Sequence, residues 1–318
     1  MPTWLRVVES LLPLVLLVSL GAALMRFGFL ERATRQQLDR LVYWVCLPAL
    51  LTKMIGVAGG LDRAVGEVAL ALALATVAAA AIGAIGWKVL RGGSDAFGVM
   101  VQGSCRGNLA FVGVPVVALG GGSPRAIAMA AVALAPTVLL FNVLAVSALS
   151  WGRSRGSGLS GANLLKGVGR ELVTNPILIA CAAGLTLATS GWRPPDVVLT
   201  SLDLIGQPAG PLALMSLGGA LVTYKVRGRI VPAAWSAAAK LLVGPLVAGT
   251  IAWTLGFDAD QALAALALAA APSAVVGYVL VTQLDGDAAL AASIIVLTTL
   301  ASAVSIGVVL GVVEAWPY

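Results

Sequence analysis

Long apolar segments, separated by short polar or glycine-rich stretches, fill almost the whole of this sequence. We divide them into ten segments, each long enough to cross a hydrocarbon core of about 30 Å as an α-helix. They cover residues 7–27, 38–57, 66–90, 95–121, 125–150, 173–190, 201–223, 232–255, 260–283 and 288–313. Trp87, Trp151 and Trp253 stand at segment ends, where amphipathic rings anchor helices at the membrane surface. The pattern predicts an all-α polytopic membrane protein with ten transmembrane helices.

The composition excludes several other classes of protein. Of 318 residues, 59% are hydrophobic and 11% are charged, whereas a soluble domain carries roughly 25% charged residues. The chain has no histidine, which removes the most common metal ligand and proton relay. The apolar segments hold neither an acidic pair nor a nucleophile motif. We therefore expect no enzyme activity, no metal site and no cofactor. The net charge of +6 comes from short loops and does not indicate a nucleic-acid partner.

Lysine and arginine positions predict the orientation of the chain in the bilayer. The connections after odd-numbered segments hold Arg26, Arg32, Arg35, Arg40, Lys88, Arg91, Arg153, Arg155, Lys166, Arg170, Lys225, Arg227 and Arg229. The opposite side holds Arg6, Lys53, Arg63, Arg125 and Arg193. This bias places the first set in the cytoplasm and both termini outside. We expect a multi-pass protein of a bacterial inner membrane, with periplasmic termini.

A basic, Gly/Ser-rich loop at residues 151–172 divides the segments into five and five. Residues 1–150 then form a first repeat and residues 173–318 a second, joined by a cytoplasmic linker. Because each half has an odd number of segments, a second copy must enter the membrane from the other side. In support, "LDRLVYWVCLPALL" at 38–51 resembles "LDLIGQPAGPLALM" at 202–215, at an offset of about 164 residues. The sequence thus predicts two inverted five-helix repeats.

Helix-breaking residues interrupt the fourth segment, in the stretch "RGNLAFVGVP" at 106–115. Proline removes a backbone hydrogen bond and glycine weakens a helix. Irregular backbone survives at membrane depth only when it is buried in protein or lines a wet cavity. We therefore predict a broken helix, interrupted by Gly107, Gly113 and Pro115, whose second half is capped by the side chain of Asn108.

The ninth segment contains a matching interruption, "APSAVVGYVL" at 271–280, in which Pro272 is the helix breaker. Two breaks that cross at the midplane predict a small polar pocket. A half-helix N-terminus attracts anions. Arg106 adds a guanidinium group, which can donate two hydrogen bonds to one carboxylate. The predicted substrate-binding residues are Arg106, Gly107, Asn108, Pro115, Pro272, Ser273, Tyr278 and Gln102. As alternatives, a proline kink, close packing at glycine or a structurally paired arginine each explain one feature, but not their combination.

These segments, together with "NPILIACAAGLTL" and "APSAVVGYVLVTQLDGD", resemble the auxin efflux carrier family over essentially the whole chain. That family includes plant PIN auxin carriers and bacterial carriers for malonate and related organic acids. The resemblance implies a fold like that of bile-acid/sodium symporters, with scaffold and transport subdomains and substrate at the crossover of helices 4 and 9. It points to Asn108, Pro115 and Pro272, and it suggests a homodimer. The long cytoplasmic loop of the longer plant carriers is missing from this chain.

The sequence therefore predicts a secondary transporter that moves small organic anions, mainly carboxylates, by elevator-type alternating access. One alternative is a sodium-coupled symporter for a larger amphipathic anion, although no acidic residue lies near the break in the ninth segment. An anion channel is a less favoured alternative. Lys240, inside the eighth segment, is expected to snorkel to the headgroups or to pair structurally.

Reporter fusions test the predicted orientation. Alkaline phosphatase fused after Ser160 should be inactive, because that loop is expected in the cytoplasm. The disulfides that the phosphatase needs do not form in this reducing compartment. A fusion after Trp192 should be active, because this connection is expected outside. Green fluorescent protein at the same two positions should give the reverse pattern, and an interchange of the two results would show that the orientation is inverted.

Overall fold

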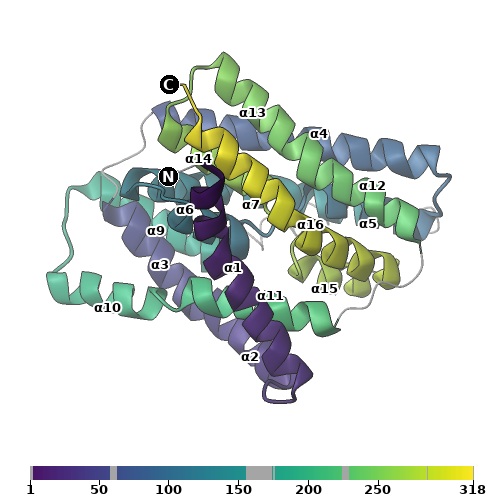
Figure 1. The fold of residues 1–318 in the computed structure, drawn as a ribbon, viewed down its shortest axis with the longest axis horizontal. Helices are drawn as coiled ribbons and strands as arrows, with labels where there is room; N and C mark the ends of the chain where they lie inside the picture. The colour runs from purple at the N-terminus through teal and green to yellow at the C-terminus, as the bar shows by residue number, and fades with distance from the viewer. Residues whose placement is uncertain are drawn as a thin grey trace.

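The computed structural model describes residues 3–57, 63–154, 174, 176–223, 229–284 and 286–317. Within these ranges every extended regular element is a helix (Figure 1). The helices of the first half are α1 (Thr3–Arg26), α2 (Arg32–Leu41), η1 (Val42–Cys46), α3 (Leu47–Val57), α4 (Arg63–Val89), α5 (Ser94–Cys105), η2 (Leu109–Gly113), α6 (Val114–Leu119) and α7 (Pro124–Ser154). The helices of the second half are α9 (Pro176–Ser190), α10 (Asp196–Gly206), α11 (Ala209–Thr223), α12 (Ile230–Ala238), η3 (Ala239–Val243), α13 (Gly244–Thr254), α14 (Ala259–Ala270), α15 (Val276–Gln283) and α16 (Ala288–Glu314).

Six helical stretches of the described residues are long and apolar enough to cross a membrane. They are Arg32–Val57, Arg63–Val89, Pro124–Leu149, Asp196–Thr223, Ile230–Thr254 and Ala288–Glu314. Of the remaining predicted segments, the first contains α1 and the sixth contains α9. The fourth and ninth are each divided in two, into α5 and η2–α6 and into α14 and α15. An all-α polytopic membrane protein is therefore confirmed, whereas the number of ten transmembrane helices and the inverted repeat remain predictions.

Three wide π-helical turns, η1, η2 and η3, each end two residues before a proline. These prolines are Pro48, Pro115 and Pro245. A proline ring clashes with the carbonyl four residues earlier, which in each case lies inside the π-turn. The widened turn accommodates the ring, so the helix continues beyond the proline. Gly113 and Pro115 were expected to break the fourth segment, but they lie inside the continuous helical stretch Leu109–Leu119. The interruption is at residues 106–108.

The helices pack as two groups, each of which contains helices from both halves of the chain (Figure 1). In the first group, α1 and α2 pack against α11, and α3 packs against α9 and α10. In the second group, α4 and α7 pack against α5, α13 and α14 pack against α4, and α16 packs against α12 and α14. The groups meet where α1 contacts α16, α3 contacts α7, and α11 contacts η2.

Polar side chains connect the helices of the first group. In α2, Arg35 donates to Asp39 at 2.8 Å, and the same carboxylate accepts the hydroxyl of Ser216 from α11. Lys53 of α3 pairs with Asp203 of α10. The guanidinium of Arg35 is nearly inaccessible, with 4% of its side chain exposed. A buried charge is tolerated when a counter-charge and hydrogen bonds accompany it, so this pairing holds α2 against α11.

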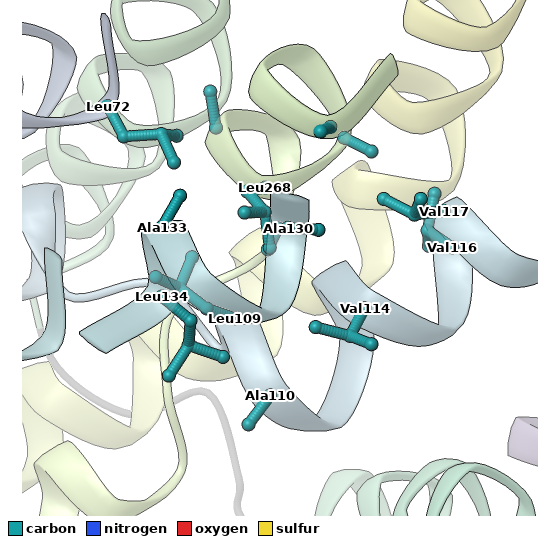
Figure 2. Packing of buried hydrophobic residues seen from close by; sticks show 14 of the residues in the cluster. Leu72, Leu109, Ala110, Val114, Val116, Val117, Ala130, Ala133, Leu134 and Leu268 are labelled. Carbon is teal, nitrogen blue, oxygen red and sulfur yellow. The ribbon is translucent and has the colours of Figure 1, made fainter. Parts of the chain in front are cut away.

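Apolar side chains hold the interrupted fourth segment inside the second group. Figure 2 shows Leu109 of η2 beside Leu134 of α7, and Val114 of α6 and Leu268 of α14 belong to the same apolar cluster. Helix α14 approaches closely at Gly113, where an added Cβ would come within 2.6 Å of the Leu268 side chain. The second half of the broken helix is therefore packed on two sides.

Helix α14 is held at its other end by a capping box. The Asp258 carboxylate accepts from the backbone N–H of Gln261 at 2.9 Å, and the Gln261 side-chain oxygen accepts from the backbone N–H of Asp258 at 3.0 Å. Arg125 at the start of α7 donates to the same carboxylate at 2.7 Å. Partial burial by itself raises the pKa of Asp258, but the bonds from Arg125 and Gln261 outweigh it and hold the pKa below its ordinary value.

Glycine at 218 should be required for the contact between α1 and α11. A Cβ at Gly218 would overlap the carbonyl oxygen of Val18, which is backbone and cannot rotate away. Gly218→Ala should therefore lower the free energy of unfolding by about 1–3 kcal/mol, measured by thermal unfolding of the purified protein. The control is Gly66→Ala in α4, where a Cβ meets nothing within 4 Å. It should be neutral or slightly stabilising, and equal losses in both variants would contradict the packing argument.

Candidate functional site

The two interruptions pair with each other through their backbones. Gly107 and Ser273 form an isolated antiparallel bridge, which joins the residues after α5 to those after α14. Its bonds run from Asn108 N to Pro272 O at 2.7 Å and from Ala274 N to Arg106 O at 3.0 Å. Breaking a helix frees N–H and C=O groups that lipid cannot satisfy. At this crossing the freed groups of each break serve as partners for the other.

Ser273 strengthens the crossing through its side chain and its backbone. Its hydroxyl donates to the carbonyl of Gly103 in α5 at 2.6 Å, and its N–H donates to the hydroxyl of Thr298 in α16 at 3.2 Å. The expected cap by Asn108 is absent, because its side chain makes no capping bond. Instead its backbone carbonyl accepts from the N–H of Val112 at 2.9 Å and from the N–H of Gly113 at 3.2 Å, and the second of these bonds, which spans five residues, begins the π-turn.

A cavity of about 220 Å³ opens beside this crossing. It is lined by Tyr43, Arg106, Gly107, Asn108, Leu109, Ala110, Phe111, Val138, Phe141, Asn142, Val146, Ile177, Ala274, Val276 and Leu280. Tyr43 and Ile177 belong to the first helix group and the other residues to the second. The cavity therefore lies at the boundary between the two groups.

Arg106 supplies the positive charge of this cavity. Among the described residues that line it, no other side chain is cationic or acidic. The guanidinium lies over the ring of Phe141, with 5.2 Å between its central carbon and the ring centroid, a cation–π arrangement. Its Nε and Nη1 atoms are buried. A positive group held away from water and against an aromatic face is well placed to attract an anion.

Two amide side chains accompany the arginine. Asn108 and Asn142 are 8% and 7% exposed and lie on different elements, the break and α7. Within the described part of the chain, the side chain of Asn108 makes no hydrogen bond, so its donors and acceptor are available to a ligand. The remaining walls are mostly apolar. The arrangement offers one charge, adaptable polar groups and a hydrophobic enclosure, which is how small-molecule sites are commonly built.

Of the residues predicted from sequence, three line this cavity: Arg106, Gly107 and Asn108. The others lie around it. The amide of Gln102 donates to the carbonyl of Gly277 at 3.1 Å, so it holds the start of α15. The Oε1 atom of Gln102 is buried and has no hydrogen-bond partner among the described residues. Gln102 also borders a separate cavity of about 10 Å³, which has room for about one water molecule. Ser273 faces Gly103, as described above.

The other three predicted residues, Pro272, Pro115 and Tyr278, each contact a different part of the structure. Pro272 contributes its carbonyl to the backbone pairing. Pro115 faces α11, where a Cβ on Gly210 would lie 3.6 Å from its ring. Tyr278 packs against the apolar cluster around α5 and α16. None of the three belongs to the described cavity lining.

The sequence did not indicate Tyr43, Phe141, Ile177 or Asn142 as site residues. An aromatic or aliphatic residue in an apolar segment gives no local signal of lining a cavity. Asn142 did carry one, since an amide within an apolar helix needs a partner. Placing it in the site requires knowing that α7 crosses the break.

The sequence signature of a family described as "Membrane transport protein" matches residues 6–130 and 160–310. The chain belongs to this family, the auxin efflux carrier family. An "Uncharacterized transporter" of Methanothermobacter thermautotrophicus is 28% identical over 94% of this chain and 95% of its own length. A "Putative malonate transporter" of Rhizobium meliloti is 26% identical over 63% of this chain and 62% of its own. This auxin efflux carrier family member is therefore a multi-pass membrane transport protein.

Removing the Ser273 hydroxyl tests the crossing of this family member. Ser273→Ala should lower the free energy of unfolding by about 1–3 kcal/mol, because the buried carbonyl of Gly103 loses its donor. Ser201→Ala is the matched control, since that exposed hydroxyl donates to the carbonyl of Val197 in its own helix. The control should change stability by less than about 0.5 kcal/mol. Thermal unfolding of both variants measures the difference, and equal stability of Ser273→Ala and the wild type would refute the role of this bond.

Proposed function

We propose that this protein is a secondary transporter that carries small organic anions, bound through a carboxylate, by alternating access. The observation that carries the proposal is the cavity beside the broken fourth segment, in which Arg106 is the charged group of the described lining. A cationic group at a helix break inside a membrane protein is expensive to maintain, and such groups mark transport sites.

The composition of the cavity supports a carboxylate as the recognised group. The fork of Arg106 can donate two parallel bonds to one carboxylate, and the free amide of Asn108 can donate a further bond or accept a substrate hydroxyl. Phe111 and Phe141 enclose the remainder of the substrate. The name of the Rhizobium meliloti relative, a "Putative malonate transporter", supports an organic acid as cargo.

The volume of the cavity favours a small substrate. At about 220 Å³ it lies below the roughly 300–1,000 Å³ of sites that enclose drug-sized ligands. A larger amphipathic anion, the alternative raised by the sequence, would need the two helix groups to separate further. We therefore assign the site to anions of a few carbon atoms.

Ten spans arranged as two inverted repeats form part of this proposal. Asp39 and Asp203 occupy matching positions in the two similar segments, 38–51 and 202–215. Asp39 bonds to Ser216 across to the second half, and Asp203 bonds to Lys53 across to the first. Lys53 follows Asp39 by about as many residues as Ser216 follows Asp203. These two contacts, and the bridge between Gly107 and Ser273, support a pseudo-two-fold relation between the two halves.

The division into two helix groups supports an elevator-type cycle. The first group, with α1, α2, α3, α9, α10 and α11, would be the scaffold, and the second group would carry Arg106 and Asn108. Because the cavity lies at their boundary, displacement of the second group along the first would move the bound anion toward one side of the membrane and then the other. We also propose that the protein lies in a bacterial inner membrane with both of its termini outside, and that it forms a homodimer.

Arg106→Gln tests the anion site. The purified wild-type protein should be stabilised by carboxylates of one to four carbon atoms and not by their neutral amides, by about 2.7 kcal/mol at a hundredfold excess over Kd. Arg106→Gln should lose this stabilisation, because a neutral side chain cannot pair with the carboxylate. Thermal unfolding with and without each compound measures it.

The matched control is Arg63→Gln, at an exposed residue whose partner within the described part of the chain is Glu67 on its own helix. This variant should retain the full carboxylate response. Stabilisation that survives in Arg106→Gln, or that disappears equally in Arg63→Gln, would place the anion elsewhere. Uptake of the stabilising carboxylate into proteoliposomes then measures the transport consequence with the same variants.

A further inference from the structure

A second buried cation, Lys240, lies close to the crossing but outside the proposed anion site. It belongs to η3, in the middle of the stretch Ile230–Thr254, and is 5% exposed. Lys240 is absent from the lining of the 220 Å³ cavity. No carboxylate among the described residues pairs with its ammonium, so an ion pair does not explain its burial. Of the two roles expected from the sequence, snorkelling and a structural pair, snorkelling does not occur, because the ammonium is buried and donates to the carbonyl of Ala269.

The ammonium of Lys240 is bound to the end of a broken helix. Its Nζ donates to the carbonyl of Ala269 at 2.7 Å. Ala269 lies in the last turn of α14, where carbonyl groups have no partner within the helix. The C-terminal end of a helix also carries partial negative charge. The positive group is therefore compensated by helix-end carbonyls and not by an acidic side chain.

The ammonium also borders the crossing. A Cβ on Gly107 would lie 3.3 Å from Cε and 3.4 Å from Nζ of Lys240. Gly107 is the residue of the first break that pairs with Ser273, and it follows Arg106 directly. Arg106 thus lines the 220 Å³ cavity, whereas the Lys240 ammonium lies next to Gly107 and does not belong to that lining.

Side chains with oxygen or sulfur atoms from three further helices line one small cavity together with Lys240. A cavity of about 20 Å³ is lined by Lys240 together with Thr76 of α4, Cys105 of α5 and Thr137 of α7. Both threonine hydroxyls donate to carbonyls of their own helices, at 2.7 and 2.8 Å, which leaves their oxygen lone pairs available. The cavity has room for about one water. Carbonyl and hydroxyl oxygens around a small space at a helix end are the donors that commonly hold a monovalent cation in transporters with broken helices.

We propose that the Lys240 ammonium is the built-in cation of the crossing, filling the position between the end of α14 and Gly107 that a dissociable monovalent cation would otherwise occupy. The tethered ammonium compensates the buried carbonyl of Ala269 at this helix end without a cation that can dissociate. Folding and anion binding consequently need no sodium. The proposal concerns a position distinct from the anion cavity, and its first readout is stability, so it can fail or succeed independently of the proposed substrate.

Chemical rescue of the full chain in detergent tests this proposal. Lys240→Ala removes three methylene groups and the ammonium, which n-propylammonium replaces atom for atom. The variant should unfold at a lower temperature than the wild type and should recover part of the loss in n-propylammonium chloride or sodium chloride. It should not recover in choline chloride, whose cation is too large, or in 1-propanol, which lacks charge. The wild type should have the same melting temperature in sodium and choline chloride.

Lys240→Met separates charge from packing, because it keeps most of the aliphatic stem and removes the ammonium. It should be destabilised in every salt, and no added cation should rescue it because the methionine fills the space. A wild-type melting temperature in Lys240→Met would overturn the proposal, as would a Lys240→Ala variant that responds to no cation. If neither variant can be purified, the melting temperature of the wild type still tests the proposal. A higher melting temperature in sodium chloride than in choline chloride would show that a dissociable cation binds, and it would refute a built-in cation.

Discussion

Backbone polar groups cannot remain unpaired inside a bilayer, and this constraint determines how the centre of the protein is built. Helix α5 ends at Cys105 and α14 ends at Ala270, so both leave groups without partners at membrane depth. The extended residues that follow the two helices satisfy one another through the bridge between Gly107 and Ser273. Neither break would be stable without the other, because each provides the hydrogen-bond partners that lipid cannot provide.

The crossing also determines where charge can be accommodated. Arg106 adopts an extended conformation, with φ −78° and ψ 95°, and its guanidinium reaches the ring of Phe141 in α7. Lys240 approaches the same crossing from another helix and binds a carbonyl at the end of α14. Two cations near one point require compensation, which the helix-end carbonyl of Ala269 supplies to Lys240 and the ring of Phe141 supplies to Arg106. The stability of the crossing therefore depends on how these two charges are accommodated.

Much of the architecture followed from local properties of the sequence. Length and apolarity of the segments are sufficient to predict membrane-spanning helices, because the hydrocarbon thickness imposes both. The break at residues 106–108 was predictable for a similar reason, since an arginine, a glycine and an asparagine in succession disfavour a helix in lipid. Local reasoning was wrong for Gly113 and Pro115, which it also treated as helix breakers. A π-turn widens the helix ahead of this proline, and the sequence carries no separate signal for that turn.

The sequence by itself determined the class of protein, the positions of the interruptions and the presence of Arg106 and Asn108 beside one of them. Only the tertiary structure decided that the Ser273 hydroxyl faces α5 instead of the cavity, that Phe141 lies under the guanidinium, and that Lys240 points inward to α14. These outcomes depend on which helices become neighbours and on the direction in which each side chain leaves its helix. Such contacts join residues far apart in the chain, and the hydrophobic pattern of a single segment contains no information about them.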